Sequence, residues 1–229
     1  MPLTFDVALD ARDSLGEGPW WDQRSGELLR VDILQRFIHR WNPATGSTSS
    51  LDVGEDVGFA VPTQGGNLIA GLRSGLSIID NSTIDSATNS VAGNDAGSRE
   101  LLCPIPGSSP ARFNDGKTDR AGRIWAGTIV DDQSEPDAVF GRLHADRFVP
   151  VLDGFSISNG LGWSPDSTTM YVTDSGVKTI WAFDFDDETL ELTNRRPFVV
   201  DTDYTPDGLT VDAEGGVWSA KWDGSRVVR

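Results

Sequence analysis

The sequence predicts an all-β fold, and within that class a β-propeller, on three observations. Glycine and tryptophan are frequent, with 25 and 8 among 229 residues, and short apolar segments alternate with turn residues, which is typical of all-β proteins. One block of sequence recurs five times at intervals of roughly 40 to 56 residues, the spacing of four-stranded propeller blades. An all-β chain of this length normally forms one domain, so we expect a single propeller domain over residues 1–229.

The repeated block consists of a short segment containing Gly or Asn, a polar turn and then an apolar strand. In four copies a Gly lies in the turn, and the fourth copy along the chain has Pro-Asp-Ser instead. Residues at equivalent positions of such copies occupy equivalent positions in the blades. The five copies begin with residues 17–22, 58–63, 114–119, 159–164 and 207–212.

Apolar and alternating segments predict the individual strands. In chain order, the expected strands cover residues 3–9, 28–33, 37–41, 68–72, 76–79, 124–129, 170–173, 179–184 and 198–200. Residues 81–110 are rich in Ser, Asn, Gly and Pro, and we expect outer-strand and loop structure there. We expect an acidic loop over residues 131–138, placed where it could lie at the mouth of a site.

Four oxygen-bearing side chains occupy the same position of the repeat: Glu17, Asn114, Asn159 and Asp207. The second copy has Gly58 there and offers no ligand. Because propeller blades are arranged radially around a channel, equivalent residues of different blades face the same axis. Carboxylate and amide oxygens are the ligands of hard divalent cations such as Ca²⁺. The repeat therefore predicts a cation site on the axis.

A simpler interpretation of the same residues stays open. Asn-Gly and Asp-Gly are strong hairpin-turn signals because both residues tolerate positive φ. The pairs Asn159-Gly160, Asp115-Gly116 and Asp207-Gly208 could therefore be turns without a ligand role.

Composition excludes several classes of function. The net charge of −16 and the pI near 4.3 disfavour binding to nucleic acid and to anionic membrane surfaces. A single cysteine, Cys103, cannot form an internal disulfide. The N-terminal residues lack the basic and apolar pattern of a secretion signal, and no segment has membrane-spanning length, so we expect a cytoplasmic protein.

Known catalytic motifs of other classes are absent from the sequence. The two histidines, His39 and His144, do not form a His-Glu-x-x-His zinc motif. No Gly-x-Ser-x-Gly segment of a serine hydrolase occurs. Residues 116–118 resemble the end of a phosphate-binding loop, but Ala111 occupies the position of its first glycine, so nucleotide binding is not expected.

Four blocks spread over nearly the whole chain resemble the SMP-30/gluconolactonase/regucalcin-like family. They cover residues 15–20, 112–119 with 122–128, 158–163 and 206–215, and Arg-Phe-Asn-Asp-Gly-Lys at 112–117 is the most specific of them. The resemblance implies a six-bladed β-propeller of the SMP-30 type. It also implies one catalytic divalent cation on the axis and hydrolysis of sugar lactones to aldonic acids.

The resemblance implies roles for individual residues. Glu17, Asn159 and Asp207 would bind the metal, and Arg112, Asn114 and Asp132 would contact the substrate. Ca²⁺ is the first expectation for the cation, with Zn²⁺, Mn²⁺ and Mg²⁺ as alternatives. A cation can polarise the lactone carbonyl and orient a water, and we assign Asp207 as the general base.

Length is the main departure from the family, whose members have roughly 300 residues because a closed propeller needs every blade. We expect a propeller truncated within the fifth blade, with an unclosed edge that could support self-association. Two other functions stay open: hydrolysis of phosphotriesters by the same axial metal, and a non-enzymatic propeller that binds calcium or a partner.

Overall fold

The computed structural model describes residues 6–81, 99–133 and 135–229, which form nineteen strands in five antiparallel sheets. The first sheet contains β1 (Gly16–Asp22), β2 (Glu27–Asp32), β3 (Phe37–Trp41) and β4 (Thr48–Asp52). The second contains β5 (Val57–Pro62), β6 (Leu68–Leu72), β7 (Gly75–Ile79) and β8 (Arg99–Pro104). The third contains β9 (Ala111–Thr118), β10 (Ile124–Val130), β11 (Ala138–His144) and β12 (Arg147–Phe155). The fourth contains β13 (Ser158–Trp163), β14 (Thr169–Asp174), β15 (Thr179–Phe185) and β16 (Leu192–Val200), and the fifth contains β17 (Thr205–Val211), β18 (Val217–Trp222) and β19 (Arg226–Val228).

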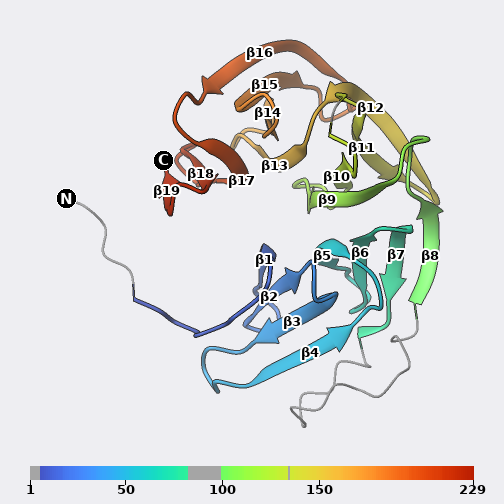
Figure 1. Cartoon of the computed structure of the whole chain (residues 1–229), viewed down its shortest axis with the longest axis vertical. Coiled ribbons are helices and arrows are strands. Elements are labelled where there is room, and N and C mark those ends of the chain that lie inside the picture. The colour runs from blue at the N-terminus through green and yellow to red at the C-terminus, as the bar shows by residue number, and fades with distance from the viewer. Residues whose placement is uncertain (1–5, 82–98, 134) are drawn as a thin grey trace.

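The sheets are arranged as the blades of a propeller. Within each sheet the strands pair in chain order. The sheets follow one another around a centre, and the first strand of each sheet lies nearest to that centre (Figure 1). Short antiparallel sheets arranged radially define a β-propeller. The predicted all-β propeller is therefore confirmed.

The predicted number of blades is wrong. The described residues form five sheets, not six, and the fifth sheet has the three strands β17, β18 and β19. The six-bladed, truncated propeller was expected from the family resemblance, whereas the sequence itself contains five copies of the repeat and each copy builds one sheet. The strand expected over residues 3–9 is also not observed in the described part: residues 6–9 lie outside any strand, and residues 3–5 lie outside the described residues.

Neighbouring sheets are held together by apolar side chains that point from their faces. Val31 and Ile38 of the first sheet are fully buried against Val57 of the second. The third and fourth sheets share an aromatic core in which Trp125 lies 6.3 Å from Trp163, measured between ring centroids. Burial of each such side chain contributes about 1.5–3 kcal/mol. The packing of the blades thus holds the innermost strands in place.

An aspartate at the end of the first strand stabilises the turn in two of the sheets. Asp119 accepts hydrogen bonds from backbone N–H groups of the turn and, at 3.0 Å, from the indole of the buried Trp125. Asp212 does the same in the fifth sheet, where the indole of Trp218 donates over 2.8 Å. The six-residue spacing from Asp to Trp is a repeated feature of the sequence, so these copies form the same local structure.

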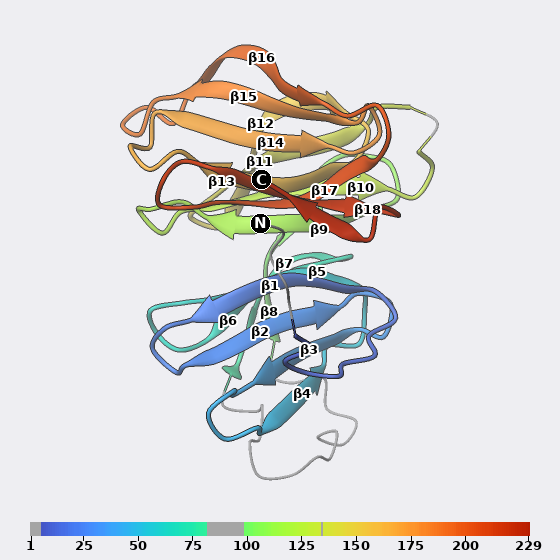
Figure 2. The ribbon, with the colours of Figure 1, turned by 90° about the vertical axis from the view of Figure 1, so that its left-hand side faces the viewer.

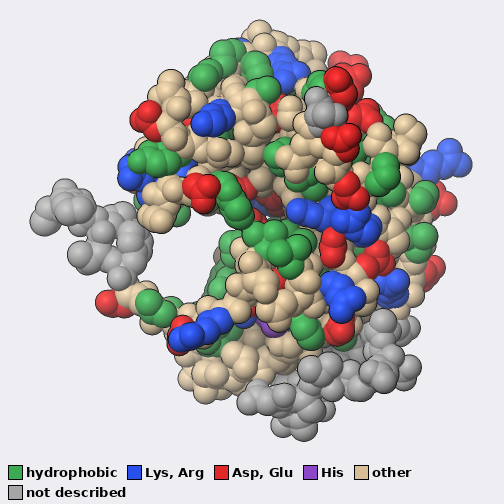
Figure 3. All heavy atoms as spheres, in the orientation of Figure 1, with side chains coloured by type: hydrophobic (Ala, Val, Ile, Leu, Met, Phe, Trp, Pro, Cys, Tyr) green, Lys and Arg blue, Asp and Glu red, His purple; other side chains and the backbone are tan. Residues whose placement is uncertain are grey.

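A cleft separates the first sheet from the fifth. It has a volume of about 940 Å³ and is lined by residues of β1, β9, β17, β18 and β19. In Figure 2, β1 lies in the lower half of the ribbon and β17 in the upper half. Figure 3 shows that the molecule is hollowed here, with hydrophobic and acidic side chains around the hollow. No helix among residues 6–81, 99–133 and 135–229 is long and apolar enough to span a membrane.

Candidate metal and substrate site

The structure places the predicted oxygen ligands on the innermost strands of four different sheets. Glu17 lies on β1, Asn114 on β9, Asn159 on β13 and Asp207 on β17, and the ligand-free Gly58 lies on β5. The Asn-Gly and Asp-Gly pairs are parts of strands and not hairpin turns. The turn interpretation is therefore wrong, and the side chains share one location near the centre of the propeller.

A shift of strand register marks this position in all five innermost strands. Asn114 is the extra residue of a bulge in β9, and Gly58 is the extra residue in β5. In β13 and β17 the shifts enclose residues 159–160 and 207–208, and in β1 the shift begins directly after Glu17. A β-bulge turns a side chain out of the regular alternation, and bulges are frequent beside active sites. Here they interrupt the alternation at the positions of the candidate ligands.

Two glycines allow the innermost strands to approach each other closely. A Cβ atom on Gly58 would lie 2.3 Å from the carbonyl oxygen of Phe113, and one on Gly160 would lie 2.2 Å from the backbone nitrogen of Leu209. Both distances are far below van der Waals contact. Any larger residue would push β5 from β9, or β13 from β17, and would move the ligand-bearing strands apart.

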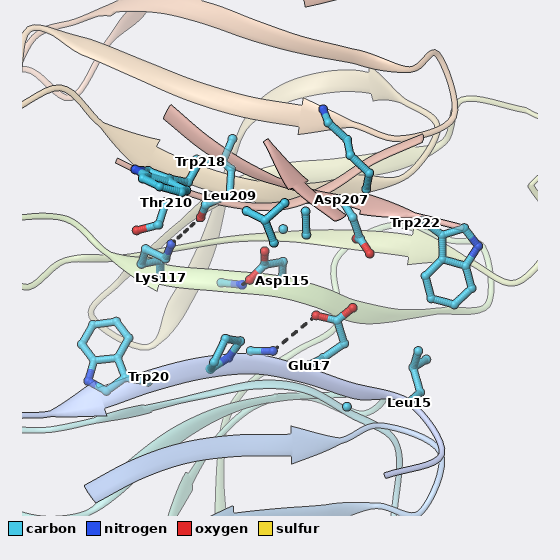
Figure 4. Close-up of a pocket in the computed structure, with 18 of the residues that line it drawn as sticks. Leu15, Glu17, Trp20, Asp115, Lys117, Asp207, Leu209, Thr210, Trp218 and Trp222 are labelled. Carbon is cyan, nitrogen blue, oxygen red and sulfur yellow. Dashed lines mark hydrogen bonds between the residues drawn. The ribbon is translucent and has the colours of Figure 1, made fainter. Parts of the chain in front are cut away.

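Three carboxylates lie close together at the centre. Burial raises the pKa of Glu17 to about 8, and the negative charges of Asp207 and Asp115 add to the rise. Burial, followed by the charge of Asp115, also raises the pKa of Asp207. In Figure 4 the carboxylates of Glu17 and Asp207 are directed toward one another. Buried charges require a partner of opposite charge or a metal, so this cluster is suited to a cation.

The two amide side chains are oriented by hydrogen bonds. Nδ2 of Asn159 donates over 3.1 Å to the hydroxyl of Ser175, and the Asn159 side chain beside Asp207 opposes the rise in the pKa of that carboxyl group. That hydroxyl in turn donates over 2.7 Å to the carbonyl oxygen of Pro206, the residue before Asp207. Asn159 and Asp207 are therefore held together by a short network that joins the fourth sheet to the fifth.

Arg112 and Asn114 form a second unit beside the carboxylates. The guanidinium of Arg112 donates over 2.6 Å to Oδ1 of Asn114, and Nδ2 of Asn114 donates over 2.9 Å to the carbonyl oxygen of Ser158. Burial lowers the pKa of Arg112, with Glu17 among the acidic groups that oppose this effect. The arrangement places a half-buried positive charge near the acidic cluster, as the resemblance implies for a substrate contact.

Asp132 has a different environment. It lies on the exposed turn that follows β10. The preceding residue, Asp131, accepts hydrogen bonds of 3.0 and 2.9 Å from Arg73, which also binds Asp56 over 3.0 Å. This network ties the turn after β10 to the second sheet. The substrate role of Asp132 stays a prediction.

Two residues of the site were not assigned a role from the sequence. Asp115 lines the cleft together with Lys117, whose Nζ atom donates over 2.8 Å to the carbonyl oxygen of Leu209 on β17. Burial lowers the pKa of Lys117, and the charge of Asp115 opposes that shift. Both residues lie in the Arg-Phe-Asn-Asp-Gly-Lys block. Strict strand alternation places Asp115 on the same face as the fully buried Phe113, which was the available signal for Asp115. The bulge at Asn114 interrupts this alternation, so the signal is unreliable.

A second group of possible ligand atoms comes together in the first sheet. Asp13, Asp32 and His39 lie close enough to share an ion. Their oxygens already have partners, because Arg30 donates to Asp13 over 2.6 and 3.0 Å and backbone N–H groups, among them that of Ser14, donate to Asp32. Burial lowers the pKa of His39, with Arg30 as the second cause. We interpret this group as a structural ion-pair network.

Comparison with known proteins identifies the family. The family model described as the SMP-30/Gluconolactonase/LRE-like region matches residues 15–229. Regucalcin from Danio rerio is 32% identical over 232 residues, covering 99% of this chain and 74% of regucalcin. The 6-deoxy-6-sulfogluconolactonase from Pseudomonas putida is 35% identical over 219 residues, covering 94% of this chain and 71% of the relative.

Solved structures agree with the sequence comparison. A structure described as a calcium-binding protein, regucalcin, from Agrobacterium tumefaciens superimposes with a TM-score of 0.85 at 25% identity, covering 96% of this chain and 72% of that one. The match of the family model extends over the five sheets and includes all of the site residues described above. The chain therefore belongs to the SMP-30/gluconolactonase family.

Proposed function

We propose that this chain is a lactonase that hydrolyses a sugar lactone to its aldonic acid and requires a divalent cation. The observation that carries the proposal is the convergence of Glu17, Asp207 and Asn159 from three separate sheets on one buried acidic cluster. A relative with 35% identity is a sulfogluconolactonase, which supports a lactone as the substrate class. The family membership supports the same class of enzyme.

The side chains of the cluster fit a hard divalent cation. Glu17 and Asp207 would supply carboxylate oxygens and Asn159 an amide oxygen, the ligand types of Ca²⁺ sites. The raised pKa values of both carboxyl groups, caused first by burial, indicate that the cluster has too little positive charge of its own. One solved relative is described as a calcium-binding protein, which favours Ca²⁺ over Zn²⁺, Mn²⁺ and Mg²⁺.

The mechanism follows from the groups around the cluster. A bound cation would polarise the lactone carbonyl as a Lewis acid. Asp207 would accept a proton from the attacking water, as a carboxylate beside a water oriented by the cation is placed to do. Arg112, held by Asn114 over 2.6 Å, would donate charge-assisted hydrogen bonds to the hydroxyl groups of the sugar or to the developing oxyanion.

Substitution of the assigned base tests the proposal. Asp207→Asn keeps the size of the side chain but removes its basicity, so we expect turnover of gluconolactone to fall at least about 10²-fold. Asp212→Asn is the matched control, because Asp212 begins the same sheet's first hairpin turn and binds Trp218 and not the cluster. Near wild-type turnover in Asp207→Asn would exclude Asp207 as the base.

The same assay separates the alternative functions. The wild-type protein is compared on gluconolactone and on a phosphotriester, each with Ca²⁺ and after chelation. Faster hydrolysis of the phosphotriester would favour the phosphotriesterase alternative. Tight Ca²⁺ binding without hydrolysis of any lactone would favour a non-enzymatic calcium-binding propeller. The cytoplasmic location and self-association at the open side stay predictions.

A further inference from the structure

We propose that Lys117 is a positioning residue that ties β17 to β9 across the centre of the propeller and thereby fixes Asp207. The inference rests on the proposed function, because the ligand it positions is the one assigned to the cation and to the reaction. Lys117 is not among the residues to which the family resemblance gave a role.

The contact joins two sheets that are not neighbours. β9 belongs to the third sheet and β17 to the fifth, and β13 of the fourth sheet packs between them. Nζ of Lys117 nevertheless reaches the carbonyl oxygen of Leu209 over 2.8 Å. Figure 4 shows this hydrogen bond in the cleft, and Lys117 lies on the same strand as Asp115. The side chain of Lys117 thus extends past β13, the innermost strand of the fourth sheet, and connects β9 to β17.

The accepting residue is well placed to control the ligand. Leu209 is the first residue of β17 that pairs regularly with β18 after the register shift, and it pairs with Ser219. The shift itself contains Asp207. Fixing the carbonyl group of Leu209 therefore fixes one end of the bulge from which the Asp207 side chain projects.

The innermost strand of the fifth sheet is packed by a neighbouring sheet on one side only. β17 packs against β13 and β14 on one side, while its other side faces the cleft opposite β1. An innermost strand between two blades, such as β9, is confined from both sides by β5 and β13. A strand packed on one side only has fewer contacts to hold it, and a hydrogen bond from the part-buried ammonium group of Lys117 adds restraint.

The ammonium group is costly to bury without compensation. Asp115, two residues earlier on β9, supplies the opposite charge. A methionine at position 117 would fill a similar space without the free-energy cost of removing a charge from water. Packing alone therefore does not explain a lysine at this position. The hydrogen bond to Leu209 and the opposite charge of Asp115 together offset the cost of burying this lysine.

The test compares Lys117→Met with Lys221→Met. Lys221 is the matched control because it is also buried and binds Asp201 over 2.5 Å, but it lies on the second strand of its sheet. Loss of a residue that orients a metal ligand typically weakens metal binding or activity by about 10- to 100-fold. We expect Lys117→Met to weaken Ca²⁺ binding in calorimetry at least about tenfold and to lower kcat more than it changes KM. Lys221→Met should lower the melting temperature with an unchanged Kd for Ca²⁺.

Hydrogen exchange gives a readout that does not depend on the activity. Faster amide exchange over residues 205–211 in Lys117→Met, but not in Lys221→Met, is expected from loss of the tether. If the wild-type protein neither binds Ca²⁺ nor hydrolyses gluconolactone, the proposed function fails, and the exchange comparison still decides whether the tether exists. Unchanged exchange over 205–211, or a lowered melting temperature with Kd and kcat unchanged, would overturn the inference.

A second pair of variants covers the case in which Lys117→Met does not fold. Asp115→Asn with Lys117→Met removes both charges, so no buried carboxylate is left without its partner. Comparison with Asp115→Asn alone isolates the effect of the lysine. The same weakening of Ca²⁺ binding and the same faster exchange over residues 205–211 are expected, and their absence would overturn the inference.

Discussion

Replacement of Glu17 by Gln should stabilise the metal-free protein while it abolishes the gain in stability from Ca²⁺. In the folded chain without metal, burial and the charges of Asp207 and Asp115 raise the pKa of Glu17 from 4.5 to about 8. Glutamine has nearly the same shape and no charge. The substitution therefore removes the electrostatic cost of the cluster and, with it, one ligand of the cation.

The magnitude follows from proton linkage. Because the pKa of Glu17 is higher in the folded state, the unfolded state binds fewer protons between pH 4.5 and pH 8, and stability is lost as the pH rises through this window. At pH 7 the difference from 4.5 corresponds to about 2.5 pKa units at 1.36 kcal/mol each, or about 3 kcal/mol. The amide of Gln is still partly desolvated, so we expect a gain of about 1–3 kcal/mol, or about 2–10 °C in Tm.

The assay is thermal unfolding in the presence of a chelator at several pH values. The advantage of Glu17→Gln should be absent below pH 4.5, grow up to pH 8 and then level off. Glu188→Gln is the control, because Glu188 is exposed in a surface turn and its replacement should change stability by less than about 0.5 kcal/mol at every pH. A less stable Glu17→Gln protein at pH 7, or one that keeps the wild-type affinity for Ca²⁺, would refute the reasoning.

Three further predictions concern the metal and the scaffold. Chelation should lower Tm, because a cation at 100 times its Kd adds about 2.7 kcal/mol, and an unchanged melting curve would contradict a well-occupied site. Gly160→Ala should lower the free energy of unfolding by about 1–3 kcal/mol, because the added Cβ would lie 2.2 Å from a backbone nitrogen of β17. Gly65→Ala, whose Cβ would lie 3.8 Å from the nearest atom, should be nearly neutral. Urea titration of both variants measures the difference. Asp119→Ala should cost about 2–3 kcal/mol, because it leaves the buried indole of Trp125 without a partner and removes one of the two carboxylates that bind Arg123. The same change at the more exposed Asp212 should cost less, and equal losses in calorimetry would refute this explanation.

The sequence predicted many of the strands and the proximity of Glu17 to Asp207 because both depend on a repeat. The strands expected over 37–41 and 68–72 agree with β3 and β6 to the residue. Equivalent positions of the repeat became equivalent positions of the blades, so Glu17 and Asp207 were expected near one another although they lie at opposite ends of the chain. Radial arrangement converts sequence periodicity into spatial proximity.

Other features were not predictable because they depend on tertiary contacts. The bulge at Asn114 leaves no periodic signal, and without it Asp115 would have been grouped with Phe113 as a simple alternating strand. The hydrogen bond from Lys117 is accepted by the backbone carbonyl of Leu209, in a separate sheet. Every residue type has this carbonyl, so the identity of residue 209 does not predict the contact. The number of blades was wrong because it was taken from the resemblance and not from the five copies of the repeat.

The arrangement of the site implies that its candidate ligands differ in how firmly they are held. Asn159 lies on β13, which is confined between β9 and β17, and Asp207 lies on β17, which faces the cleft on one side. The network from Asn159 through Ser175 to the backbone of Pro206 and the hydrogen bond from Lys117 both act on β17. Two independent sets of polar contacts thus converge on a strand that is packed by a neighbouring sheet on one side only. Substitutions that remove these polar contacts to β17 should therefore weaken cation binding more than substitutions of equal cost in stability in the second sheet, which contributes Gly58 and no candidate ligand.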